Sequence, residues 1–249
     1  YRYKMVYFRD QYLTIEDQEK LTLRFGSFGT DAYTKGMPGH PNVQHVLKEA
    51  STKVDRVFGE GWHTDSPFLA QPPAISLLYA RHVPPYGGDT WWSNCELAYE
   101  FLSDGMKAQL QGLRVHMTAR EAIRLTIRKD EQGKEIVGDM KMVMNNEDEI
   151  IKGSFHPLVR THPETGKQAL YVDTIYAHGI LGMKDEEARP LLDYLAQHAT
   201  RDDFTCRLRW QAGTLVMWDN RICQHKAFND YDGHKREMIR TMVNGEVPY

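Results

Sequence analysis

The last third of the chain contains short strand-like segments separated by turns, and this pattern limits the fold more than any other feature. Segments 204–210, 214–219 and 236–244 are rich in β-branched and aromatic residues, a composition typical of strands. Turn-forming residues separate them at 211–213 and 229–233. Short strands at nearly regular spacing favour a β-sandwich or a β-barrel.

The first part of the chain adds further strands, together with helices that would lie outside the sheets. Segments 3–8 and 74–83 are strand-like, and Thr14 is followed three residues later by Asp17, a spacing typical of the start of a helix. Another helix is predicted over residues 185–200. The sequence therefore predicts a mainly β fold with flanking helices.

Residues 118–152 form a long stretch that is polar, mixed in charge and weakly periodic. Long insertions in compact domains often cover an active site, so we predict a lid there. No linker, internal repeat or low-complexity segment divides the chain. We therefore expect one domain, residues 1–249, that carries this insertion.

Composition and charge exclude several classes of protein. The chain has 249 residues, 41% of them hydrophobic, which is enough for a sizeable core. Its 31 basic and 34 acidic residues give a net charge of −3 without long blocks of one sign, so we expect no nucleic-acid partner. No run of about 18 apolar residues is present, and we expect no membrane span.

The cysteines are Cys95, Cys206 and Cys223, an odd number without the Cys-x-x-Cys spacing of structural zinc sites. We interpret them as small hydrophobic residues of the core. A reducing cytoplasm is the compartment that fits this pattern.

A motif with metal-binding character occurs at His63-Thr64-Asp65. If this stretch is an extended strand, its side chains alternate between two faces, so His63 and Asp65 point to the same side and can bind one ion. A histidine and a carboxylate make two-thirds of the facial triad that leaves positions open on non-haem iron(II). A hydrogen-bonded pair at a strand edge is the alternative, because His-x-Asp also occurs by chance.

A second histidine must come from another of the eleven histidines in the chain. His225 is the strongest candidate because it follows the strand-like segment 214–220 and precedes another that contains Arg236 and Arg240. The end of a strand is a place where a rigid scaffold can hold a ligand.

Four blocks of the sequence together resemble the taurine dioxygenase / 2,4-dichlorophenoxyacetate dioxygenase (TauD/TfdA) family. The resemblance covers nearly the whole chain, and the blocks occur in the order and at the spacing of the family. They are His63-Thr64-Asp65, Gly87-Gly88-Asp89-Thr90-Trp91-Trp92, the segment 218–225 that ends at His225, and the pair Arg236 and Arg240. The resemblance implies a single catalytic domain built on a double-stranded β-helix, which is a jelly-roll, cupin-like core.

Members of this family depend on Fe(II) and 2-oxoglutarate, and the resemblance assigns residues to both. His63, Asp65 and His225 match the metal ligands. Arg236 and Thr90 match the pair that binds the distal carboxylate of 2-oxoglutarate. An arginine can grip a carboxylate through two charge-assisted hydrogen bonds, a geometry that a lysine lacks. For Thr90, a strand hydroxyl that faces solvent is the alternative.

Three further residues match positions near the substrate in the family. Arg240 would face the anionic group of the substrate or help to orient 2-oxoglutarate. Arg236 and Arg240 are four residues apart, so in a strand both face the same side, where two buried arginines need anionic partners. Trp92 and Trp218 match indoles close to the metal pocket, and ordinary core packing is the alternative for both.

The resemblance also implies a reaction. A C–H bond of a small anionic substrate would be hydroxylated at the expense of O2 and 2-oxoglutarate, with release of succinate and CO2. Sulfonates, alkyl sulfates and aryloxyalkanoates would then lose their heteroatom group, as in taurine catabolism. Related halogenating enzymes replace the carboxylate ligand by a small residue, so the presence of Asp65 favours hydroxylation.

Two other kinds of function could use the same residues. One is a zinc-dependent hydrolase, because zinc also accepts histidine and carboxylate ligands; Thr90 and Arg236 would have no role in it. The other is a non-catalytic jelly-roll binding protein, which an intact ligand set argues against. Many relatives self-associate, so we expect a homodimer or homotetramer.

Overall fold

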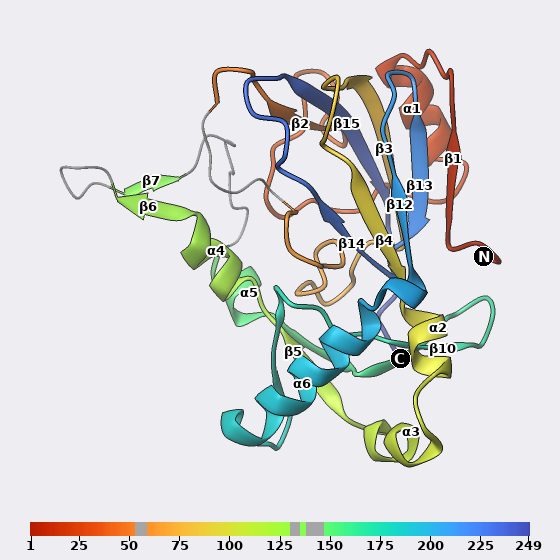
Figure 1. The fold of residues 1–249 in the computed structure, drawn as a ribbon, viewed down its shortest axis with the longest axis vertical. Helices are drawn as coiled ribbons and strands as arrows, with labels where there is room; N and C mark the ends of the chain where they lie inside the picture. Colours follow the sequence, from red (N-terminus) through yellow and green to blue (C-terminus); the bar gives the residue numbers. More distant parts are fainter. Residues whose placement is uncertain (53–58, 130–134, 138–146) are drawn as a thin grey trace.

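Two antiparallel sheets form the core of the computed structural model (Figure 1). The structure describes residues 1–52, 59–129, 135–137 and 147–249. The larger sheet has five strands in the order β1-β13-β3-β15-β2. Their bounds are Met5–Phe8 for β1, Leu215–Asp219 for β13, Ile75–His82 for β3, Arg236–Val243 for β15 and Gln44–Lys48 for β2.

The smaller sheet has three strands in the order β12-β4-β14. It packs against the inner face of the larger sheet, and the rings of Trp92 and Trp218, one from each sheet, lie 5.7 Å apart. Two antiparallel sheets with a shared core are the arrangement of a jelly roll. The strand bounds are Thr205–Leu208 for β12, Thr90–Asn94 for β4 and Cys223–Ala227 for β14.

Alternation along the strands gives the larger sheet an outer and an inner face. In β3, Leu77 belongs to the outer cluster, whereas its neighbour Leu78 belongs to the core between the sheets. In β15, Met238 is part of that same inner core. Arg236 and Arg240 are each two residues from Met238 in a strand whose pairing with β2 is regular, so both face inward.

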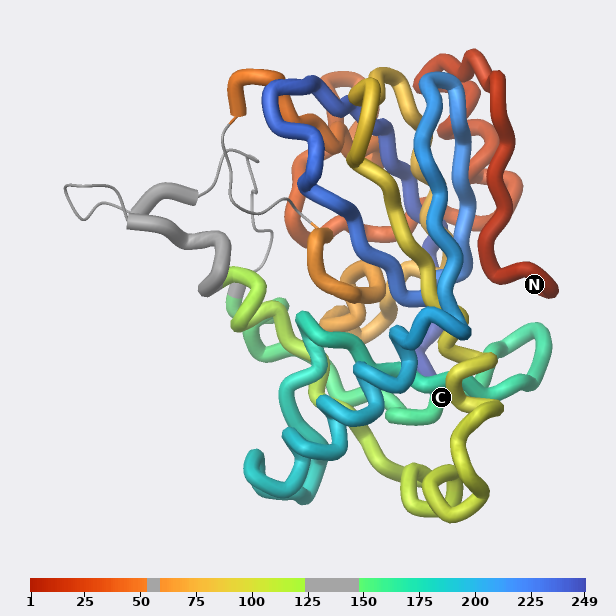
Figure 2. The backbone as a smooth tube through the Cα atoms, viewed as in Figure 1, coloured from red at the N-terminus to blue at the C-terminus, as the bar shows by residue number. Residues whose placement is uncertain are grey.

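Helices cover the outside of this core. The helix α1, Ile15–Thr22, lies on the outer face of the larger sheet, where Gln18 Nε2 donates to Ile239 O at 3.1 Å. Figure 2 shows most of the other helices below the two sheets, together with the C-terminus. Their bounds are Cys95–Glu100 for α2, Asp104–Leu110 for α3, Arg120–Thr126 for α4, Glu147–Lys152 for α5, Asp185–Ala199 for α6 and Asp202–Phe204 for the short 3-10 helix η1.

Three small sheets complete the fold. One has the strand order β11-β5-β8, and the other two are the pairs β10-β9 and β6-β7. The strand bounds are Ala177–Ile180 for β11, Arg114–Met117 for β5, Ser154–Pro157 for β8, Gln168–Leu170 for β10, Val159–Thr161 for β9, Ile127–Lys129 for β6 and Glu135–Val137 for β7.

The structure confirms the prediction of a mainly β fold with a jelly-roll core and flanking helices. The first helix begins as predicted, because Thr14 and Asp17 form a reciprocal capping box. The stretch 118–152 contains α4, β6, β7 and α5, so it has more regular structure than predicted. Residues 130–134 and 138–146 of the predicted lid lie outside the described residues, and the lid and the single-domain organisation stay predictions. No helix in the described ranges has the length and apolar character needed to span a membrane.

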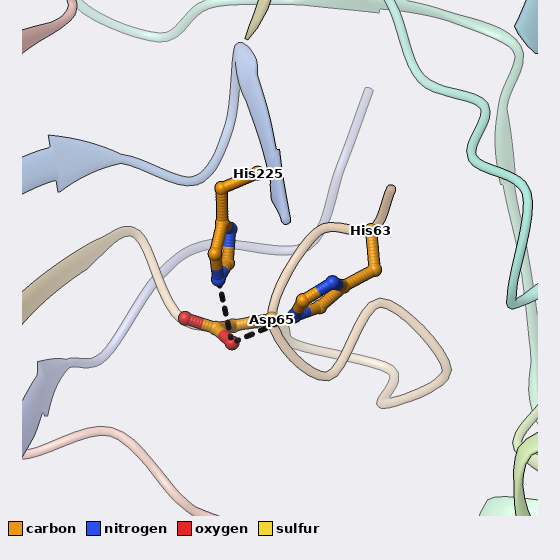
Figure 3. Close-up of side chains that lie close together, drawn as sticks. All are labelled: His63, Asp65 and His225. Carbon is orange, nitrogen blue, oxygen red and sulfur yellow. Dashed lines mark ion pairs between the residues drawn. The ribbon is translucent and has the colours of Figure 1, made fainter. Parts of the chain in front are cut away.

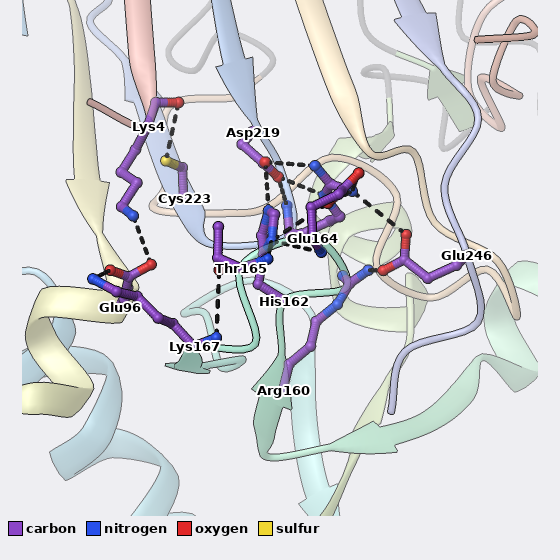
Figure 4. A network of polar contacts seen from close by, with 11 residues as sticks. Lys4, Glu96, Arg160, His162, Glu164, Thr165, Lys167, Asp219, Cys223 and Glu246 are labelled. Atoms are coloured by element: carbon purple, nitrogen blue, oxygen red, sulfur yellow. Dashed lines mark hydrogen bonds and ion pairs between the residues drawn. The ribbon is translucent and has the colours of Figure 1, made fainter. Parts of the chain in front are cut away.

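A buried ionic network lies where β13 ends (Figure 4). The Asp219 carboxylate accepts hydrogen bonds from Arg221 Nε at 2.8 Å and Nη2 at 2.7 Å, and contacts His162 Nε2 at 2.9 Å. Glu164 pairs with Arg221 at 2.8 Å, and Glu246 near the C-terminus contacts the same guanidinium at 3.8 Å. The network therefore ties the β9–β10 hairpin and the C-terminal segment to the larger sheet.

Burial by itself would raise the pKa of Asp219, but the hydrogen bonds from Arg221 and His162 lower it to about 2. A carboxylate with a depressed pKa stabilises the fold above its unfolded pKa of about 3.9, and this contribution is lost as the pH falls. Asp219→Asn should therefore lower the free energy of unfolding by about 3 kcal/mol at pH 7. The difference from wild type should shrink as the pH falls from about 4 toward 2.

Urea denaturation at a series of pH values checks this expectation. Asp203→Asn is the matched control, because Asp203 also pairs with an arginine, Arg201, at 2.8 Å but on the surface. Its loss should cost less than about 1 kcal/mol. An Asp219→Asn variant as stable as wild type at pH 7 would contradict the role of the network.

Candidate metal centre and active site

His63 and His225 are brought together by a single antiparallel bridge between their backbones. His63 N donates to His225 O at 3.0 Å, and His225 N donates to His63 O at 2.8 Å. His225 lies in β14, but the structure corrects the expectation that His63-Thr64-Asp65 is a strand. His63 forms only this isolated bridge, and Asp65 lies in the bend that follows. The two side chains nevertheless lie on the same side of the chain and close together.

The three side chains form one compact group of metal-ligating atoms (Figure 3). Their ligand atoms all lie within 4.8 Å of one another, and all three residues are buried. His63 Nε2 is 3.9 Å and His225 Nε2 is 3.8 Å from Asp65 Oδ1. Among the described residues, no other group of three such side chains meets this criterion. Two imidazoles and one carboxylate form the donor set of the facial triad.

The protonation states suit metal binding. Burial by itself would raise the pKa of Asp65, but Arg240, the two histidines and a hydrogen bond from Ser76 lower it to about 2. Burial and the neighbouring His63 lower the pKa of His225 to about 3. At pH 7 the carboxylate is ionised and His225 is neutral, so their contact is not an ion pair. A neutral imidazole and a carboxylate are the forms that bind metal.

Further contacts hold these side chains in place. Ser76 Oγ donates to Asp65 Oδ2 at 2.6 Å, and Asn220 Nδ2 donates to Ser76 Oγ at 2.6 Å. His63 Nδ1 lies 2.7 Å from the carbonyl oxygen of Gly61. A donor bond from Nδ1 to this carbonyl leaves Nε2 as the ligand atom. Such contacts orient metal ligands and tune their affinity.

A second buried carboxylate fixes the backbone of the motif. Asp173 Oδ2 accepts the backbone N–H of Thr64 at 3.3 Å, and its Oδ1 accepts those of Ile175 at 2.9 Å and Tyr176 at 2.6 Å. Burial raises the pKa of Asp173. Neither Asp173 nor Ser76 was predicted from the sequence, because neither belongs to a recognisable motif; Asp173 lies 109 residues from Thr64, and Ser76 lies 11 residues from Asp65.

Thr90 and Arg236 lie on facing sheets and are connected through Trp210. Trp210 Nε1 donates to Thr90 Oγ1 at 2.9 Å, and the Arg236 guanidinium lies 5.9 Å from the centre of the Trp210 ring. Thr90 is buried, which excludes the alternative of a solvent-facing hydroxyl. Arg236 Nε donates to Gly88 O at 3.2 Å. Among the described residues, no carboxylate lies within ion-pair distance of Arg236, whose pKa is lowered by burial.

Arg240 lies on the same face of β15 but in different surroundings. Its Nη1 donates to Asp65 Oδ1 at 3.3 Å, and its Nη2 donates to Asp31 Oδ2. The guanidinium thus bridges the candidate metal ligand and a carboxylate from the N-terminal part of the chain. The assignment of Arg240 to the substrate stays a prediction.

Trp92 and Trp218 both lie beside His225. The ring of Trp218 is 4.8 Å from that of His225, and its Nε1 donates to Asn220 Oδ1 at 2.7 Å. Trp92 is the cross-strand neighbour of His225 and is almost fully buried. Both indoles therefore pack around the candidate metal ligand, and their contact with a substrate stays a prediction.

Comparison with known proteins decides the family. Residues 1–242 match the model of the family described as "Taurine catabolism dioxygenase TauD, TfdA family". The chain belongs to this family. The prediction made from the four sequence blocks is thereby confirmed, and the TauD/TfdA family is one of oxidoreductases.

Individual relatives agree with this membership. The chain is 32% identical to an alkylsulfatase of Acinetobacter baylyi over 98% of its own length and 74% of that protein. It is 35% identical to a 2,4-dichlorophenoxyacetate dioxygenase of a Burkholderia species over 80% of its length and 63% of that protein. The crystal structure of a taurine dioxygenase from Burkholderia xenovorans superposes with a TM-score of 0.79 at 34% identity, covering 98% of this chain and 77% of that one.

Ser76→Ala should weaken the binding of Fe(II) about tenfold or more, because the Asp65 carboxylate loses a hydrogen bond that orients it. Anaerobic equilibrium dialysis with Fe(II) measures this affinity. Ser93→Ala is the matched control, since Ser93 is also a buried serine but donates to a backbone carbonyl, that of Ala199, rather than to a candidate metal ligand. Equal losses in the two variants would contradict a specific role of Ser76.

Proposed function

We propose that this chain is an Fe(II)- and 2-oxoglutarate-dependent dioxygenase that hydroxylates a C–H bond of a small anionic substrate and releases succinate and CO2. The observation that carries the proposal is the buried group of His63, Asp65 and His225, with ligand atoms within 4.8 Å of one another. The relatives support the substrate class, since they include an alkylsulfatase and a 2,4-dichlorophenoxyacetate dioxygenase. A sulfonate, an alkyl sulfate or an aryloxyalkanoate is therefore the expected kind of substrate.

His63, Asp65 and His225 would hold the iron, which supplies the O2 chemistry of the reaction when it is bound together with 2-oxoglutarate. The protein then has to position the reactants and keep water out. A related structure, that of AAD-2, contains Mn(II) and N-oxalylglycine; it has a TM-score of 0.77 at 29% identity and covers 99% of this chain and 84% of that one. This similarity supports a metal and an organic acid in the same pocket.

Arg236 and Thr90 would bind the distal carboxylate of 2-oxoglutarate. Arg236 is buried, and among the described residues no carboxylate lies at ion-pair distance from it; Asp89 acts on it over a longer range and is itself paired with Arg207. Thr90 Oγ1 already accepts a hydrogen bond from Trp210, so its own O–H remains able to donate. A carboxylate placed here would accept hydrogen bonds from the Arg236 guanidinium of the larger sheet and from the Thr90 hydroxyl of the smaller one.

The contacts of Asp65 also fit hydroxylation. Its Oδ2 is held by Ser76 and its Oδ1 lies closest to the two imidazoles, so one oxygen would bind the metal while the other is fixed by the protein. Trp92 and Trp218 would exclude water on the side of His225. If the hydroxylated carbon carries a sulfate, sulfonate or aryl ether, the product would then lose that group.

The rival functions explain less of the structure. A zinc hydrolase could use the three ligands, but the buried Arg236 and Thr90 would be left without a role. A binding protein without catalysis would not need two imidazoles arranged around one ionised carboxylate. We further propose a cytoplasmic homodimer or homotetramer with one catalytic domain, which the three free cysteines and the family support.

Anaerobic titration with Fe(II) and 2-oxoglutarate tests the proposed function. Addition of O2 should then give succinate, and its formation should increase with one member of a panel of sulfonates, alkyl sulfates and aryloxy acids. His225→Ala should abolish this succinate. A variant that kept full substrate-dependent succinate formation would show that His225 is not a ligand, and zinc-dependent hydrolysis without 2-oxoglutarate would support the rival function.

Arg236→Gln should raise the KM for 2-oxoglutarate about 100-fold, because the loss of charge-assisted hydrogen bonds costs about 3 kcal/mol. The KM for the primary substrate should change far less. Steady-state kinetics with each reactant varied in turn measures the two effects. Arg209→Gln is the control, because Arg209 is an exposed arginine whose side chain donates to Pro85 O on the surface. The reverse pattern would assign 2-oxoglutarate to Arg240.

A further inference from the structure

Asp31 is a buried carboxylate next to the candidate metal centre that belongs to no motif. Its Oδ1 accepts the backbone N–H groups of Tyr33 at 2.8 Å and Thr34 at 3.0 Å. This pattern is an Asx turn, in which the side chain caps its own loop. The turn fixes one oxygen of Asp31 and directs the other, Oδ2, at Arg240. The carboxylate is therefore held in position by its own loop.

Asp31 and Asp65 together engage both terminal nitrogens of Arg240. Nη2 donates to Asp31, and Nη1 donates to Asp65 at 3.3 Å. These two nitrogens form the fork by which an arginine grips an oxyanion. Burial by itself would lower the pKa of Arg240, but the two carboxylates raise it above its ordinary value. The positive charge of Arg240 is thus already matched inside the protein.

The two inward-facing arginines of β15 consequently differ. Arg236 has no carboxylate at ion-pair distance among the described residues, whereas Arg240 has two. An acid that enters beside Arg236 meets a guanidinium that no carboxylate of the described residues holds in an ion pair. An acid that enters beside Arg240 competes with Asp31 and Asp65 for its terminal nitrogens. If it displaces Asp31, that buried carboxylate keeps only its backbone hydrogen bonds and loses its arginine. Breaking a buried pair in this way is strongly unfavourable.

We propose that Asp31 is a specificity-determining residue, which occupies Arg240 and so reduces the affinity that a sulfonate or sulfate group of the substrate gains there. This inference rests on the proposed function and deepens it. The acid group contributes little at Arg240, and selection depends on the rest of the substrate molecule. A repulsive carboxylate next to an attractive guanidinium is a common way to tune specificity.

The test compares an acid with its neutral isostere in wild type and in Asp31→Asn. The probes are 1-butanesulfonate and 1-butanesulfonamide, titrated by anaerobic calorimetry into protein loaded with Fe(II) and 2-oxoglutarate. In Asp31→Asn the affinity for the sulfonate should rise about tenfold or more, while that for the sulfonamide stays within about twofold. Asp104→Asn, an exposed aspartate of α3, is the control and should match wild type.

Two results would overturn the proposal: no gain in sulfonate affinity in Asp31→Asn, or an equal gain for the sulfonamide. If the variant does not fold, wild type alone decides, because a preference of about tenfold or more for the sulfonate over the sulfonamide would show that Arg240 is available to anions. A smaller preference supports the proposal. Failure of the proposed function is recognised separately, since wild type would then not bind 2-oxoglutarate in the loading step.

Discussion

The ionised carboxylate of Asp65 is the constraint on which the rest of the site depends. It lies in the core between two sheets, where burial alone would raise its pKa, yet its pKa is about 2. Arg240 and Ser76 come from the larger sheet, and His225 from the smaller one. The charge of Asp65 is therefore stabilised from the larger sheet, whereas the imidazole that faces it comes from the smaller one, and the two sheets must keep their spacing for the site to persist.

A single strand, β15, supplies two arginines with different roles. Alternation puts Arg236 and Arg240 on the same inner face, but their partners come from loops that alternation does not control. Asp31 meets Arg240, whereas the neighbour of Arg236 is the carbonyl of Gly88. The same residue type thus has no carboxylate of the described residues at ion-pair distance at one position and forms an internal ion pair at the other. The residue type alone does not predict which of these two environments an arginine has.

The sequence predicted most strands of the two main sheets, because strand composition and turn residues are local patterns. It did not predict β14, the strand that holds His225. The spacing of His63 and Asp65 suggested two metal ligands, and the position of His225 after a strand, together with the family resemblance, suggested the third. The contacts that set the charge and orientation of these residues were not predicted. Asp31 contacts Arg240 from 209 residues away, and no local pattern records such a contact. The motif itself is a bend rather than a strand, because its geometry is set by the bridge to His225 and by Asp173.

The end of β13 joins the stability of the fold to the geometry of the metal centre. Three consecutive residues there contact different parts of the structure. Trp218 packs on His225, Asp219 joins the ionic network with Arg221, and Asn220 donates to Ser76, which in turn holds Asp65. Buried polar networks stabilise a fold only when every member is satisfied. Asp219 itself touches no candidate ligand. A substitution at Asp219 that moves the backbone would nevertheless displace the adjacent Asn220, and with it the Ser76 hydroxyl that holds Asp65.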